Sequence, residues 1–241
     1  MRISLRIAVV ALAACLGSIA LACGGPEPLP TPTPTSTPVP LTAEEVLSRS
    51  GTVMGELESF RFDLTHEVGT SAFLPGVSVE RAAGQLEIPN KLIVEFTGLF
   101  GDFPIRVTLI AIDDINYLTN PITGSWEVVE ATVSPIAFFK PDEGIITVMS
   151  SITEASFQGS QDDVYRIAGR MPASALSALM GATVEDGMVD VDVEIQPDDF
   201  LLTKVRFAGQ VTPSDDPTTI RVVTLSKFDE PVTIEAPEIT Q

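Results

Sequence analysis

Few side chains of this sequence are of types that catalyse reactions or bind metals. The single histidine, His66, has Glu67 as its nearest carboxylate, but neighbouring residues of a strand point to opposite faces. We therefore interpret His66 as a packed or sheet-edge residue. Four aspartate pairs lack the Asp-x-Asp-x-Asp-Gly spacing of a calcium loop, and we interpret them as solvated turns. They lie at residues 113–114, 162–163, 198–199 and 215–216. With no glycine-rich phosphate loop and no Gly-x-Ser-x-Gly elbow either, we predict a protein that is not an enzyme and has no cofactor and no metal.

The two cysteines, Cys15 and Cys23, both lie close to the N-terminus. The rest of the chain therefore has no disulfide framework, no thiolate metal site and no cysteine nucleophile. The stretch Ala22-Cys23-Gly24-Gly25 resembles the lipobox of bacterial lipoproteins, in which small residues precede a cysteine that becomes diacylated. Ala20 occupies the position where that motif usually has leucine, and Leu21 follows it. We predict lipidation at Cys23, with palmitate-type acyl chains as a membrane anchor, and removal of Cys15 with the signal.

The first 22 residues have the layout of a secretory signal peptide. Arg2 and Arg6 form a short basic region, and a run of apolar and small residues follows over 7–21. The alternative is an uncleaved transmembrane helix, although residues 7–22 barely reach the ~17–25 apolar residues that span a bilayer. The expected location is the extracytoplasmic side of the cell membrane, with the protein exported and held there by lipid.

Residues 23–40 read as the lipidated cysteine followed by a tether. Seven of the 19 prolines fall between Pro26 and Pro40, alternating with threonine and serine, which favours an extended polyproline II chain. At ~3.1 Å per residue, such a spacer would hold the folded part about 45 Å from the membrane. The alternatives are a proline-rich motif that a partner recognises and glycosylation of the threonines.

The charge of the chain excludes some partners. It has 14 basic and 33 acidic residues among 241, and a formal charge of -19. Because residues 1–40 hold only Arg2, Arg6 and Glu27 as charges, residues 41–241 carry -20. Nucleic acid is not an expected partner, since phosphate contacts require clustered lysine and arginine. Electrostatic attraction to anionic lipid headgroups is disfavoured for the same reason.

The pattern of residues 41–241 predicts an α+β domain. Thr42 and Glu45 form a capping box that starts a helix over 42–58, and two shorter helices are expected at 141–152 and 172–180. Alternating apolar and polar residues predict about ten strands joined by short turns, hence an antiparallel sheet. These strands are expected near 60–68, 77–88, 92–96, 103–112, 115–119, 125–130, 163–169, 189–195, 205–211 and 219–228. A sheet of this length should curl into a half-barrel, with the helices covering its concave face.

Several apolar runs could line a cavity for acyl chains, which requires convergent apolar walls and few polar groups. The alternative is that they fill an ordinary core. The candidate lining residues are Phe60, Phe62, Leu64, Phe96, Phe103, Ile105, Val107, Leu109, Phe138, Phe139, Met149, Leu176 and Met180.

The order of several segments resembles the LppX/LprG-type (LppX_LprAFG) lipoprotein family over nearly all of residues 41–241. The segments are GDFPIRVTLIAIDDINYLTNPITGSWEVVE, KPDEGIITVMSSI, DVYRIAGRMPASALSALMG, DVDVEIQPDDFLLTKVRFAG and TLSKFDEPVTIEAP. The resemblance implies a fold like that of the lipoprotein-localisation proteins LolA and LolB, a half-barrel closed by helices over an apolar cavity. It transfers no catalytic residue.

The function that follows is that of a membrane-anchored lipoprotein. It would bind an amphiphilic lipid or glycolipid in its cavity and carry or present this ligand in the cell envelope, with an envelope transporter or acceptor as a further partner left open. The alternative is a non-enzymatic scaffolding or partner-binding lipoprotein with a filled core.

Overall fold

Local sequence signals start the first helix and the first strand. Thr42 Oγ1 accepts a hydrogen bond from the Glu45 backbone N–H at 3.2 Å, and Glu45 Oε2 accepts one from the Thr42 N–H at 2.8 Å. This capping box begins helix α1 (Ala43–Gly55), which ends three residues before the predicted end. Strand β1 (Ser59–Val68) follows, and its alternating pattern buries Phe60 and Leu64 on one face.

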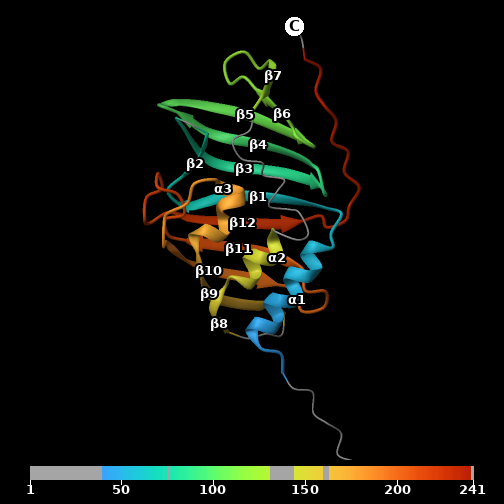
Figure 1. The fold of residues 1–241 in the computed structure, drawn as a ribbon, viewed down its shortest axis with the longest axis vertical. Helices are drawn as coiled ribbons and strands as arrows, with labels where there is room; N and C mark the ends of the chain where they lie inside the picture. Colours follow the sequence, from blue (N-terminus) through green and yellow to red (C-terminus); the bar gives the residue numbers. More distant parts are fainter. Residues whose placement is uncertain (1–39, 75, 131–143, 160–162, 240–241) are drawn as a thin grey trace, which may run out of the picture. The chain divides into compact units, whose positions relative to one another are not determined.

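The computed structural model describes residues 40–239 except 75, 131–143 and 160–162 (Figure 1). Residues from Pro40 onward form one compact unit with its own core. The elements that follow β1 are β2 (Ser71–Leu74), β3 (Val77–Glu87), β4 (Lys91–Phe100), β5 (Phe103–Ile112), β6 (Ile115–Thr119), β7 (Trp126–Val129), α2 (Ile145–Ser150), β8 (Thr153–Phe157), β9 (Tyr165–Pro172), η2 (Ala173–Leu176), α3 (Ser177–Met180), β10 (Met188–Ile195), β11 (Leu202–Ala208) and β12 (Ile220–Ser226).

All strand pairs of the described part are antiparallel and belong to one open sheet. Its order is β7-β6-β5-β4-β3-β1-β12-β11-β10-β9-β8, with β2 paired to β3 outside this path. The first and last strands meet in the middle, where Phe62 lies opposite Leu225. This meeting joins an N-terminal meander, β1 and β3–β7, to a C-terminal one, β8–β12.

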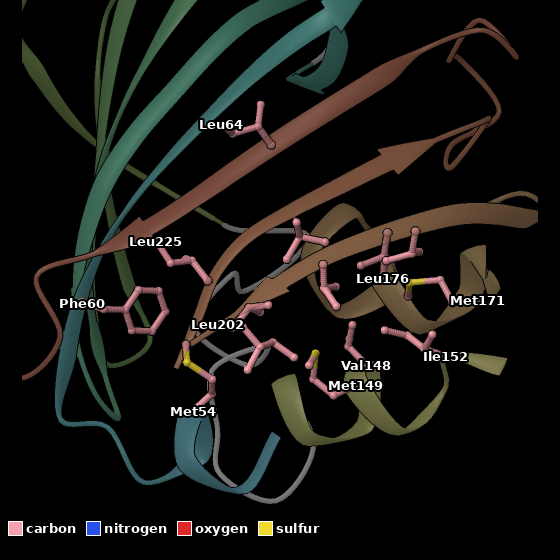
Figure 2. Packing of buried hydrophobic residues seen from close by; sticks show 14 of the residues in the cluster. Met54, Phe60, Leu64, Val148, Met149, Ile152, Met171, Leu176, Leu202 and Leu225 are labelled. Carbon is pink, nitrogen blue, oxygen red and sulfur yellow. The ribbon is translucent and has the colours of Figure 1, made fainter. Parts of the chain in front are cut away.

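The helices lie together on one face of the sheet, in front of β1 and β8–β12 (Figure 1). Helix α1 packs closely on α2, since a Cβ added to Gly51 would lie 3.3 Å from Met149 Cβ. Figure 2 shows Met54 of α1 and Val148 and Met149 of α2 pointing toward strand residues such as Leu202. The predicted fold class, a curved antiparallel sheet with helices on its concave face, is confirmed.

The structure differs from the sequence prediction in four elements. Within the described residues the sheet has twelve strands instead of about ten, because β2 and β8 were not expected. Both are short and carry no long period-two pattern. The helix predicted over 172–180 is a 3₁₀ turn, η2, continued by one turn of α-helix, α3. Of the helix predicted over 141–152, residues 141–143 lie outside the described part and α2 spans Ile145–Ser150.

None of the helices in the part of the chain that the structure describes is both long enough and apolar enough to cross a bilayer.

Candidate functional site

An apolar cavity lies between the concave face of the sheet and the helices. Its volume is about 140 Å³, and its walls consist almost entirely of apolar atoms. Strands from both halves of the sheet, α2 and η2–α3 contribute to it. Three lining residues lie near one another at one side of the cavity: Met171 of β9, Ile152 and Leu176 of η2 (Figure 2). Among the described residues every lining side chain is apolar, so what this wall offers a ligand is an apolar surface.

The structure brings six of the predicted lining residues to this cavity. They are Phe60, Phe62, Leu64, Phe96, Met149 and Leu176. The strand pairing explains why the β1 and β4 residues meet: Ala82 of β3 lies opposite Leu64 on one side and opposite Phe96 on the other. Ala82 itself is 3% exposed and lines the cavity between them. Whether these residues touch a lipid stays a prediction.

Five other predicted lining residues lie in the described part of the chain and do not belong to this wall. Phe103 begins β5 beside a turn and is 74% exposed, so its placement in the cavity was wrong. Val107 is buried, and Ile105, Leu109 and Met180 are half-buried against the core cluster without reaching the cavity. The β5 run was predicted as lining because it is apolar, but apolarity alone does not tell which part of a strand faces a void. Phe138 and Phe139 lie outside the described residues.

The C-terminal half of the wall was missed by sequence reasoning. The inward-facing residues of β10, β11 and β12 line the cavity: Val191, Val193, Leu202, Val205, Phe207, Val223 and Leu225. The alternation that predicted these strands also marks their apolar phase, as in Val191 and Val193 against Asp190 and Asp192. Applied to every strand, the same signal would have found them.

The opposite face of the sheet is polar and charged. Arg206 pairs with Glu67 at 3.0 Å and with Asp192 at 3.3 Å, and Arg81 forms a hydrogen-bonded ion pair with Asp63. Hydrogen bonding to these carboxylates raises the pKa of both guanidinium groups. The acidic residues of β10 lie on this exposed face, as the alternation predicts. Exposed pairs of this kind contribute little to stability, so this face supplies solubility more than rigidity.

One polar cluster is buried near the cavity, and it corrects the interpretation of an aspartate. Asp215 was expected in a solvated turn, but its side chain is 1% exposed and its Oδ1 lies 2.6 Å from Arg221 Nη2, whose side chain is 3% exposed. They are the two charged residues that are buried in the described part of the chain. His66 is packed, as expected, and both of its ring nitrogens have hydrogen-bond partners.

An open, curved antiparallel sheet that holds an apolar cavity under short helices defines a class of half-barrel proteins. Within that class, this chain belongs to the LppX_LprAFG lipoprotein family, whose sequence model matches residues 42–234. The predicted family is thereby confirmed. No curated protein matches its sequence.

Two solved structures share the fold at low sequence identity. LprF from Mycobacterium bovis is 16% identical, with a TM-score of 0.62, over 81% of this chain and 96% of that one. The lipoprotein LppX from Mycobacterium tuberculosis is 18% identical, with a TM-score of 0.56, over 80% of this chain and 98% of that one. At such identities the likeness concerns the course of the backbone.

Proposed function

We propose that this protein binds the acyl part of an amphiphilic lipid or glycolipid in the cavity and carries or presents it in the cell envelope. The observation that carries the proposal is the cavity itself, which lies between sheet and helices and has walls that are apolar almost throughout. Binding without catalysis fits this wall, since no side chain in it has a nucleophile, an acid or a base.

The driving force would be the transfer of hydrocarbon out of water. Each CH₂ group that enters the cavity contributes about 0.8 kcal/mol. Apolar cavities of about 150 Å³ stay free of water and accept small apolar molecules, and the cavity here has a similar volume of about 140 Å³. A longer acyl chain would need more room than this volume, and the helical side of the wall consists of the short elements α2, η2 and α3.

The lipid anchor is a second part of the proposal. Acyl chains on Cys23 would hold the protein on the membrane, since two or more chains give stable attachment. The proline-rich residues 26–40 would act as the spacer between anchor and half-barrel. An acidic protein is not attracted to an anionic membrane, so the anchor would be what keeps it there.

The test uses the chain from Gly24 onward, which lacks signal and anchor but keeps the whole compact unit that begins at Pro40. Mass spectrometry of organic extracts from the purified protein should detect co-purified lipid. Ala82→Phe places a ring in the cavity between Leu64 and Phe96 and should abolish the lipid signal. Ala83→Phe is the matched control, because Ala83 lies on the other face of the same strand, and it should retain the lipid.

Equal lipid content in the two folded variants would show that the lipid lies elsewhere. A clean extract from the unsubstituted protein would instead favour a partner-binding lipoprotein with a closed core.

A further inference from the structure

Four side chains form a buried polar network beside the cavity, held by hydrogen bonds among His66, Ser71 and Arg221 and by the ion pair between Arg221 and Asp215. Arg221 Nε donates to Ser71 Oγ at 2.6 Å, and Ser71 Oγ lies 2.8 Å from His66 Nε2. On the other side of Arg221, the ion pair to Asp215 completes the chain of contacts. Ser71, Arg221 and Asp215 are buried, and His66 is half-buried. We call this set the His66 network.

The hydrogen bonds of the network determine which nitrogen of His66 carries the proton. Ser71 Oγ already accepts from Arg221, so its single O–H is available to donate to His66 Nε2. His66 Nδ1 lies 2.8 Å from the carbonyl oxygen of Glu80, which only accepts, so Nδ1 must carry the hydrogen. With a neutral His66 protonated at Nδ1, the Ser71 hydroxyl therefore has an acceptor for its hydrogen within the network.

The network joins segments that are far apart in the sequence. His66 belongs to β1, Ser71 to β2, the Glu80 carbonyl to β3 and Arg221 to β12, and Asp215 lies in the loop between β11 and β12. Asp215 Oδ2 also accepts from the backbone N–H groups of Val211 and Thr212, at 3.0 and 2.8 Å, which ties that loop down.

Beside the network, the β1–β2 turn lies close to the β11–β12 loop. Gly69, with φ +77° in the β1–β2 turn, has so little space that an added Cβ would lie 2.7 Å from Thr219 Oγ1 of the β11–β12 loop. The β1–β2 turn and the β11–β12 loop thus pack directly on one another. Loosening the network would free both.

Residues next to the network line the cavity. Arg221 lies opposite His66 on β1 and opposite Phe207 on β11. Two residues further on the same face of β12 is Val223, which lies opposite Leu64. Phe207, Val223 and Leu64 all belong to the cavity wall, so the network adjoins one end of the cavity.

Protonation of His66 would conflict with this arrangement. Burial lowers the pKa of His66 below its ordinary value of 6.5 and Arg221 lowers it further, while the hydrogen bond to the Glu80 carbonyl and the charge of Asp215 oppose the shift. The other charged groups nearby are the side chains of Glu67 and Glu80, which are exposed, and Glu67 pairs with Arg206 on the opposite face. A protonated Nε2 would deprive the Ser71 hydroxyl of its acceptor and place a second cation beside Arg221.

We propose that the His66 network is an acid-sensitive clasp: protonation of His66 Nε2 by solvent releases the β1–β2 turn and the β11–β12 loop, and so loosens that end of the cavity. A ligand bound at neutral pH would then dissociate more readily in a mildly acidic compartment. The part of this inference that concerns the ligand rests on the proposed function. The part that concerns the loops does not.

The ligand-free test measures amide hydrogen exchange as a function of pH. After correction for intrinsic exchange rates, protection of segments 69–74 and 209–219 should fall between about pH 7.5 and about pH 5. The fall should come below the ordinary histidine pKa of about 6.5, because burial lowers the pKa of His66. His66→Gln keeps an amide that can reach the same partners but does not titrate, and it should abolish this change. Because His66 is the only histidine in the chain, its single imidazole signal in NMR spectra reports the titration directly.

The ligand test uses N-phenyl-1-naphthylamine, an uncharged fluorescent probe of apolar cavities. Its affinity should fall about tenfold over the same pH range in the unsubstituted protein, which corresponds to a shift of about one pKa unit, and stay constant in His66→Gln. A parallel loss of affinity in both proteins, or unchanged protection of the two segments, would overturn the clasp while leaving lipid binding intact. Absence of probe binding at neutral pH would contradict the proposed function, and hydrogen exchange would still decide on the clasp.

Discussion

Arg221 and Asp215 form an ion pair of 2.6 Å inside the protein, where each side chain is almost completely removed from solvent. Two charges at this depth cost solvation free energy, and each is tolerated because the other is present. The pair connects the middle strand β12 to the loop that precedes it, so it fixes the loop at the end of the cavity.

Replacement of Asp215 should destabilise the protein strongly. Asp215→Ala leaves the Arg221 charge buried without a partner, and we expect the free energy of unfolding to fall by about 3–5 kcal/mol. Asp102→Ala, at an exposed turn, should change it by less than about 0.5 kcal/mol. Urea denaturation followed by circular dichroism measures both. Similar small effects of the two substitutions would mean that water or another group compensates Arg221.

A substitution at Gly84, on the same face of β3 as Ala82, should disturb the cavity wall. A Cβ on Gly84 would lie 2.9 Å from Phe62 Cζ and closer still to the carbonyl oxygen of Ile93. Gly84→Ala therefore forces the ring of Phe62, a lining residue, to move, and should cost about 1–3 kcal/mol. Denaturation and probe binding should both be affected. Gln85→Ala on the same strand is the control, and an equal loss there would indicate a general weakness of β3.

The capping box of α1 should contribute measurably to stability. Thr42→Ala removes the acceptor for the Glu45 N–H and should lower the free energy of unfolding by about 0.5–2 kcal/mol. Thr52→Ala, within the same helix, replaces a residue of weaker helix propensity and should leave stability equal or slightly raised. Thermal unfolding of the two variants in parallel makes the comparison. A neutral Thr42→Ala would mean that packing alone holds the start of α1.

Cys23 should decide where the protein is found in the cell. With Cys23→Ala the acylation site is lost, and we expect the protein to move from the membrane fraction to the soluble extracytoplasmic fraction. Cell fractionation with immunodetection follows this shift, and mass spectrometry of the native N-terminus checks for acyl chains. A variant that stays in the membrane would support an uncleaved helix over residues 7–22 instead.

Sequence patterns predicted most of the sheet because a strand that is buried on one face alternates apolar and polar residues along the chain. That signal is clear in β10, where valines alternate with acidic residues, and absent from β2, which has four residues. The capping box likewise predicted the start of α1 because its chemistry is local. The weaker helix signals at 141–152 and 172–180 were overestimated, since a few apolar residues at helical spacing also fit a single turn.

The cavity was only partly predictable, because a void depends on which strands meet across the sheet. Phe103 and Phe60 are equally apolar in the sequence, yet Phe103 is beside an exposed turn and Phe60 faces the helices. The residues around Asp215 in the sequence give no signal of its burial. Its partner Arg221 interrupts the apolar phase of β12, and such an inward-facing charge is a reason to search for a buried counter-ion.

The position of β1 between β3 and β12 has a consequence for biogenesis. In the middle of the sheet β1 pairs with β12, and Arg61 lies opposite Ser226. The hydrogen bonds between these two strands cannot form until almost the entire polypeptide has been synthesised. A chain that emerges with its N-terminus first could therefore pair β1 with β3 early, while the other edge of β1 waits for β12, and pairings of such long range form slowly. The order of the strands thus makes the joining of the N-terminal and C-terminal meanders a late step in folding.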